Sequence, residues 1–204
     1  MDAPIDEVLD HWFGSWSDAD PLPEGGPPQF ALWWRGGPAV DEELRRRFGE
    51  LHAAALSGEL DPWAVTPRGT LALVIVLDQL SRNLGRGSAA MFTSDARARA
   101  LVRSSLARGD EAHLAPIERY FLYMPLMHSE DLADHELALD RFGALQAETA
   151  HTARASVYAG ALDYERRHRD IVARFGRYPH RNALLGRAST AEEQVFLTEP
   201  GSSF

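Results

Sequence analysis

Cysteine and lysine are both absent from this chain of 204 residues, and each absence limits its chemistry. Without cysteine there is no thiol nucleophile, no thiolate zinc site and no iron–sulfur cluster. Without lysine there is no amine for Schiff-base chemistry and no P-loop lysine to hold a phosphate. All 21 basic residues are therefore arginine. The chemistry left to the chain rests on carboxylates, histidine, hydroxyls, tyrosine and arginine.

Long apolar runs are absent too. The longest, Leu71–Leu77 (LALVIVL), is too short to cross a bilayer, and the first residues, MDAPIDEVLDHW, lack the basic start and apolar run of a signal peptide. The net charge of −9 opposes binding to nucleic acid or to an anionic membrane, since both are polyanions. We expect a cytoplasmic protein of one domain, residues 1–204, with no nucleic-acid or membrane partner. The oligomeric state is left open.

Helix signals recur along the chain, and no segment alternates as a strand would. The pattern predicts an all-α fold, an irregular array of antiparallel helix hairpins with seven to nine helices, and it has no 34-residue repeat period. One helix is expected to break or kink at Pro125, and Ser129 is expected to cap the helix after it. The expected helices cover 5–13, 38–57, 67–84, 95–108, 116–124, 130–148, 154–175 and a short segment opened by a Ser189–Glu192 capping box.

The first polar stretch is DQLSRN, Asp78–Asn83, at the end of the most apolar predicted helix. Asp78 and Arg82 are four residues apart, so their side chains meet on one face. One interpretation is an ion pair that closes a helix end. The other is a functional pair, because a charged pair on an apolar helix is costly. We take Asp78, Arg82 and Asn83 as candidate ligand-binding residues.

The second stretch is MHSEDLADHE, Met127–Glu136. His128, Asp131 and His135 are donors of the kind that a metal site uses. However, the two histidines lie two helical turns apart, and the stretch lacks a His-Glu-x-x-His pattern. We predict no metal and no cofactor.

Two roles are expected within the same stretch. Asp134 and Glu136 are expected at a solvated acidic helix start, where the helix dipole favours them. His128 follows the predicted break and is a candidate general acid or base. Glu130 or Asp131 would orient its ring, so all three are candidate catalytic residues.

The third stretch is RFGRYPHRN, residues 174–182, in the most basic part of the chain. Seven arginines lie between residues 166 and 187, against one acid, Asp170. Some suit the dipole at a helix end. The polar residues after Gly176 suit a carboxylate or phosphate ligand instead, since a guanidinium group binds either anion with two parallel hydrogen bonds. The alternative is that they pair internally with the acids near Asp78 and Glu130. These polar residues are the candidate ligand-binding residues Arg177, Arg181 and Asn182 and the candidate catalytic residue His180.

With these stretches in place, the chain resembles the bacterial domain of unknown function 924 family, which is assigned to the tetratricopeptide-repeat-like superfamily. The resemblance runs nearly end to end through VLDHWFG, TPRGTLALVIVLDQLSRN, ERYFLYMPLMHSEDLADHE, LDYERRHRDIVARFGRYPHRNALLGRAS and FLTEPGSSF. It implies a tetratricopeptide-like, all-helical fold but no activity. Two departures are Ser81, where the family usually has proline, and the lack of an aromatic near Leu84 or Gly85. The family's signature positions correspond here to Asp78, Gln79, Arg82, Asn83, His128, Ser129, Glu130, Asp131, Arg174, Gly176, Arg177, Pro179, His180, Arg181 and Asn182.

Two functions follow as hypotheses. In the first, the three stretches converge on a pocket for a small anionic molecule, with His128 and His180 as acid and base and arginines as the anion-binding groups. A hydrolase or lyase without a redox cofactor fits these residues best. In the second, the chain is a helical scaffold that binds a protein partner, as tetratricopeptide-like folds do, and the polar stretches are structural.

Overall fold

The computed structural model describes residues 3–203, and these form helices and loops with no strand. The all-α prediction is confirmed. Counting α2 with η1, and α4 with η3 and α5, as continuous helices gives nine helices in residues 3–203, within the expected range. Met1, Asp2 and Phe204, the ends of the predicted domain, lie outside the described residues, and the tetratricopeptide-like arrangement stays a prediction.

The helical elements follow one another with short connections, apart from a loop between α1 and α2 that is rich in glycine and proline. In chain order they are α1 (Ala3–Phe13), α2 (Pro28–Phe30), η1 (Ala31–Arg35), α3 (Pro38–Ser57), η2 (Asp61–Val65), α4 (Pro67–Val74), η3 (Ile75–Leu80), α5 (Ser81–Leu84), η4 (Ala89–Phe92), α6 (Asp95–Arg108), η5 (Asp110–His113), α7 (Pro116–Met127), α8 (Leu132–Thr149), α9 (Ala155–Phe175), η6 (Pro179–Arg181) and α10 (Ala191–Phe196).

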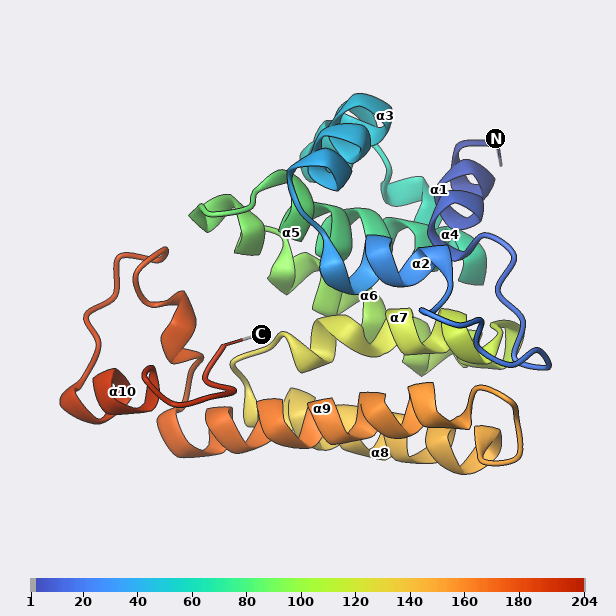
Figure 1. Ribbon diagram of the computed structural model, residues 1–204. Helices are drawn as coiled ribbons and strands as arrows, with labels where there is room; N and C mark the ends of the chain where they lie inside the picture. The colour runs from blue at the N-terminus through green and yellow to red at the C-terminus, as the bar shows by residue number, and fades with distance from the viewer. Residues whose placement is uncertain (1–2, 204) are drawn as a thin grey trace.

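The helices stack in layers (Figure 1). Helices α8 and α9 form an antiparallel hairpin at the bottom of the view, α7 lies above it, and α6, α4 and α3 follow. One apolar core runs through these layers, from Ile5 in α1 to Leu162 in α9. After α9 the chain turns back at one end of the stack, where Tyr178 and Phe196 pack on Val172 in a smaller apolar cluster.

The central helix begins as the sequence predicts. The hydroxyl of Thr66 accepts a hydrogen bond from the Gly69 amide at 3.1 Å, and Pro67 occupies the first turn. Residues 69–81 are all buried, in agreement with the apolar pattern. Within this helix Ile75–Leu80 forms a π-helical turn, which the sequence does not reveal. Such wide turns are frequent at functional sites, and this one contains Asp78.

The break predicted at Pro125 is wrong. Helix α7 continues through Pro125 to Met127. The proline lacks the amide that would bond to the carbonyl four residues earlier, but it sits in the last turn, where little helix remains to disrupt. Residues 120–127 are all buried, so packing against the neighbouring layers holds that turn.

Two predicted caps are displaced along the chain. The α8 cap is Asp131, whose Oδ1 accepts from the Ala133 amide at 2.9 Å, because Ser129 is buried in contacts described below. At α10 the capping box is Thr190 with Glu193 instead of Ser189 with Glu192. The run STAEE contains both versions of this pattern, so local sequence does not choose between them.

A pair of glycine substitutions tests the packing around the start of α4. A Cβ at residue 69 would overlap the carbonyl oxygen of Trp63, whereas a Cβ at Gly143 in α8 meets no atom within 4 Å. We expect Gly69→Ala to lower the free energy of unfolding by about 1–3 kcal/mol. Gly143→Ala should raise it by about 0.5–1 kcal/mol, since alanine loses less backbone entropy in a helix.

Urea denaturation of both variants and the wild type provides the measurement. Equal stability changes of the same sign would contradict this packing.

Candidate functional site

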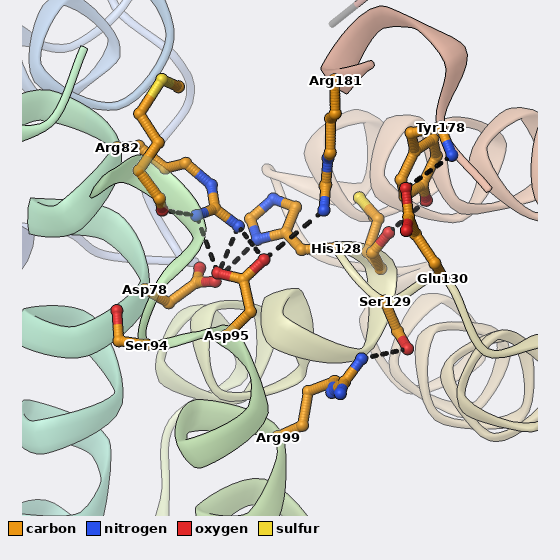
Figure 2. Close-up of polar contacts among 12 residues, drawn as sticks. Asp78, Arg82, Ser94, Asp95, Arg99, His128, Ser129, Glu130, Tyr178 and Arg181 are labelled. Atoms are coloured by element: carbon orange, nitrogen blue, oxygen red, sulfur yellow. Dashed lines mark hydrogen bonds and ion pairs between the residues drawn. The ribbon is translucent and has the colours of Figure 1, made fainter. Parts of the chain in front are cut away.

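Five charged or titratable side chains meet where the central helix ends (Figure 2). Asp78 and Arg82 come from η3 and α5, Asp95 from the first residue of α6, His128 from the end of α7 and Arg181 from η6. We call these five residues the Asp–Arg cluster. Members of all three polar stretches are present in it, which the sequence suggested by chemistry alone.

Asp78 lies at the bottom of the cluster and is fully buried. Its Oδ1 is 2.8 Å from His128 Nδ1 and 3.7 Å from the Arg82 guanidinium, while its Oδ2 accepts from Gln79 Nε2 at 2.6 Å. Burial alone would raise the pKa of Asp78, but the nearby His128 and Arg82 outweigh burial and the pKa is lowered. The side chain is therefore an anion held beneath His128.

Arg82 links Asp78 to Asp95. Its two terminal nitrogens donate to the two oxygens of Asp95 at 2.8 and 3.0 Å, a bidentate pair, and Nη1 also donates to the carbonyl of Met91. Burial opposes the charge of Arg82, but the two aspartates outweigh burial and raise its pKa. Arg82 is thus well supplied with partners.

Arg181 is less well supplied. It is 6% exposed, and its one ion pair is with Asp95, at 3.4 Å, on an oxygen that Arg82 already contacts. Its Nε is buried with no hydrogen-bond partner among the described residues. The rings of Phe92 and Tyr178 lie 4.7 and 4.4 Å from the guanidinium carbon and compensate part of the desolvation. Burial, together with Arg82, lowers the pKa of Arg181. A buried donor without an acceptor costs about 1–3 kcal/mol, so the hydrogen-bonding capacity of this guanidinium is incompletely used.

His128 is positioned for proton transfer. Nδ1 faces the Asp78 carboxylate, and in the view of Figure 2 the ring lies between the guanidinium groups of Arg82 and Arg181. The Asp78 carboxylate accepts a hydrogen bond from Nδ1–H, which leaves Nε2 to give or take a proton. Within residues 3–203 Nε2 has no hydrogen-bond partner, and the side chain is 15% exposed. The carboxylate that orients His128 is Asp78, so the expectation that Glu130 or Asp131 would do so is corrected.

Glu130 instead fastens the C-terminal segment to the loop before α8. It accepts two hydrogen bonds from Arg187, at 2.6 and 2.8 Å, and one from the Tyr178 amide at 2.8 Å. Burial would raise the pKa of Glu130, but these bonds outweigh burial and lower it. The hydroxyl of Tyr178 donates to the Met127 carbonyl at 2.6 Å. These contacts hold the turn that carries Arg181 against the end of α7.

His180 lies beside the cluster. Burial first, and then the charge of Arg181, lower its pKa to about 4; Glu130 raises it, while Arg187 and Arg82 lower it further. Its ring is 5.4 Å from that of Tyr178. The ring is therefore neutral near pH 7, so His180 can exchange hydrogen bonds with a ligand but does not carry a positive charge there.

The other four candidates have structural partners. Asn83 donates to Asp41 of α3 at 2.9 Å. Arg177 pairs with buried Glu193, and Asn182 bonds to Ser189, Glu193 and Arg187, so both hold the segment around α10. Asp131 is the α8 cap.

The second stretch also supplies buried structural contacts that the sequence did not predict. Asp134 is 3% exposed instead of solvated; it accepts from Ser129 at 2.6 Å and pairs with Arg103. His135 is buried against Glu165 at 2.7 Å. No group of three or more histidines and carboxylates within residues 3–203 is arranged to hold a metal ion.

Sequence reasoning missed Asp95, Phe92 and Tyr178. Asp95 is the first residue of a helix, where an acid is already explained by the helix dipole, so nothing marked it as a partner for two arginines. The departure at Ser81 has a visible role: its hydroxyl lies 2.8 Å from His52 Nε2 and 2.9 Å from the Ser94 hydroxyl. Ser94 donates in turn to the Leu77 carbonyl, inside the π-helical turn.

Two surface hollows lie away from the cluster. One, of about 580 Å³, lies between α1 and the start of α4, where Arg68 pairs with Asp6 and Glu118. The other, of about 400 Å³, is lined mostly by apolar residues of α1, α2, η1 and α3. Neither hollow is lined by a member of the Asp–Arg cluster. The side chains of Arg82, Asp95 and His128 in the Asp–Arg cluster are each partly exposed to solvent.

Acid should destabilise the fold through His168, which lies under Tyr178. Burial lowers the pKa of His168 to about 3, against about 6.5 in an unfolded chain. Between these pH values the unfolded state binds a proton that the folded state does not, so the free energy of unfolding falls as pH falls. The loss is about 1.4 kcal/mol per pH unit. In His168→Gln this contribution is lost. Urea denaturation at pH 6 and pH 5 should therefore show a fall in the free energy of unfolding that is smaller than in the wild type by about 1.4 kcal/mol.

The matched control is His151→Gln. His151 is exposed in the loop after α8, so this variant should keep the wild-type slope. A His168→Gln variant with the wild-type slope would contradict the burial of a neutral His168.

The chain is similar to proteins of one bacterial family. No helix in residues 3–203 combines the length and apolar character needed to cross a membrane. No curated protein matches the sequence. A solved structure, "Structure of Protein of Unknown Function ATU0120 from Agrobacterium tumefaciens", is 33% identical with a TM-score of 0.77, and the match covers 96% of this chain and 97% of that chain. The model of the family "Bacterial protein of unknown function (DUF924)" matches residues 8–201, and this chain belongs to that family.

Proposed function

We propose that the Asp–Arg cluster binds a small anionic molecule and acts on it by proton transfer. The observation that carries this proposal is Arg181, a buried guanidinium with an unpaired Nε and one long ion pair, beside a His128 ring oriented by Asp78. Anion binding at Arg181 would supply the missing acceptor. The same anion would lie next to the Nε2 of His128.

The reaction class follows from what the cluster contains. Asp78 orients His128, and His128 moves a proton at Nε2. Ser94, which directly precedes Asp95, is 4% exposed and its hydroxyl already donates to the Leu77 carbonyl. It is therefore a poor nucleophile. Proton transfer to or from a bound substrate, with water as the second reactant in a hydrolase or with elimination in a lyase, is what these groups support.

The scaffold hypothesis makes a different claim about the same residues. In that case the cluster would be a buried ion network that fixes the order of the helices, and its arginines would bind nothing from solution. Ligand binding therefore separates the two hypotheses.

A thermal-shift screen of small carboxylates and phosphates tests the proposal. A ligand at a hundred times its Kd stabilises the folded state by about 2.7 kcal/mol, which raises the Tm of a protein of this size by roughly 5–10 °C. Arg181→Gln should abolish the shift, because it removes the anion-binding guanidinium.

The control is Arg174→Gln, which removes an exposed arginine of the same segment, paired with Glu192. It should keep the shift. A screen in which no anion stabilises the wild type, or in which Arg181→Gln responds as the wild type does, would favour the scaffold.

A further inference from the structure

The charges of the Asp–Arg cluster balance when His128 is neutral: two aspartates face two arginines. The pairing is nevertheless uneven. Arg82 holds both oxygens of Asp95 and also lies 3.7 Å from Asp78, while Arg181 shares one oxygen of Asp95 at 3.4 Å. The Asp95 carboxylate therefore occupies the position that a bound carboxylate would take beside Arg181, and its ion pair with Arg181 is a long one.

A ligand carboxylate at Arg181 would redistribute these pairs. Arg181 would pair with the ligand, and Arg82 would keep Asp95 through its bidentate contact. Asp78 would then rely on His128, 2.8 Å away. The cluster would carry one uncompensated negative charge, and an unpaired charge in a buried site is costly. One proton on His128 removes that charge and gives each anion its own cation.

A dianionic phosphate fits this charge count less well. With a dianion bound, the cluster would still carry one uncompensated negative charge after His128 is protonated. His180 and His168, the other imidazoles near the cluster, are both held neutral by burial, so neither supplies the balancing proton at moderate pH.

From this charge balance we infer that the ligand is a small monocarboxylate and that its binding is coupled to the uptake of one proton by His128. This inference rests on the proposed function and extends it in two respects: it names the substrate class, and it makes His128 a general acid in the bound state. The proton then sits on Nε2, beside the ligand, while Nδ1 stays on Asp78. The charged and titratable groups around His128 in this scheme are Asp78, Arg82, Asp95, His168 and Arg181.

Isothermal titration calorimetry with propionate and with inorganic phosphate tests the inference. Repeating each titration in two buffers with different ionisation enthalpies counts the protons taken up. We expect propionate to bind the wild type with uptake of about one proton. Its affinity should fall as pH rises, because binding takes up a proton. Phosphate should bind more weakly than propionate at the same pH.

Two variants locate the effect. His128→Gln should bind propionate without proton uptake, and Asp95→Asn should bind it more tightly, because the competing carboxylate is gone from Arg181. Arg174→Gln should behave as the wild type.

Propionate binding that depends on Arg181 but takes up no proton, or phosphate binding tighter than propionate binding, would overturn the inference and leave the proposed function standing. If neither probe binds the wild type, the inference is contradicted; the proposed function is contradicted as well if no anion in the thermal-shift screen stabilises the wild type.

Discussion

The ion-pair network of this protein depends on one buried carboxylate, that of Asp78. An isolated charge in the middle of an apolar helix would be costly, and the fold supplies three neighbours that keep it ionised: Gln79 on one oxygen, His128 and Arg82 on the other. Each neighbour comes from a different turn or helix. Asp78 therefore joins the central helix to the end of α7 and, through Arg82, to the start of α6. Asp78 makes these contacts from within the π-helical turn Ile75–Leu80.

The remaining polar contacts are arranged around this centre in separate groups. Glu130, Arg187 and Tyr178 hold the C-terminal turn to the end of α7, and Arg177 with Glu193 holds the turn to α10. These groups satisfy their charges internally. Arg181 belongs to the segment that these contacts hold, yet its own guanidinium makes one ion pair, with Asp95 at 3.4 Å, within residues 3–203. Like Arg119, Arg141 and Arg154, Arg181 has a buried nitrogen without a hydrogen-bond partner among the described residues, but it is the one of these four that lies in the Asp–Arg cluster beside His128. That position is the physical basis for proposing a binding site in this region.

Much of the fold was predictable from the sequence, because its helices carry their own start and stop signals. Thr66 with Pro67 begins α4, and Gly58, Gly109 and Gly176 directly follow α3, α6 and α9, in agreement with a helix start at 67 and helix ends at 57, 108 and 175. The errors arose where several local signals overlapped or where tertiary packing prevailed. STAEE contains two capping boxes, and the buried last turn of α7 tolerates Pro125.

The candidate site was predictable in part. Charge and spacing identified Asp78, Arg82, His128 and Arg181, because such groups are unusual on apolar helices or after a helix stop. The same reasoning did not separate Arg181 from Arg177, since the acid that saturates Arg177 lies sixteen residues further along the chain. Nor did it find Asp95, whose position at a helix start has an ordinary explanation. Which charge pairs with which is decided by tertiary structure.

The short hydrogen-bond chain beside the π-helical turn has a direction. The carbonyl of Leu77 can only accept a hydrogen bond, so the Ser94 hydroxyl donates its one hydrogen to that carbonyl. Ser94 therefore accepts a hydrogen bond from the Ser81 hydroxyl. The one hydroxyl hydrogen of Ser81 is then used in the bond to Ser94. In the hydrogen bond between Ser81 and His52, the imidazole must therefore be the donor. A serine at position 81 thereby selects one tautomer of a histidine in another helix, the form with its hydrogen on Nε2.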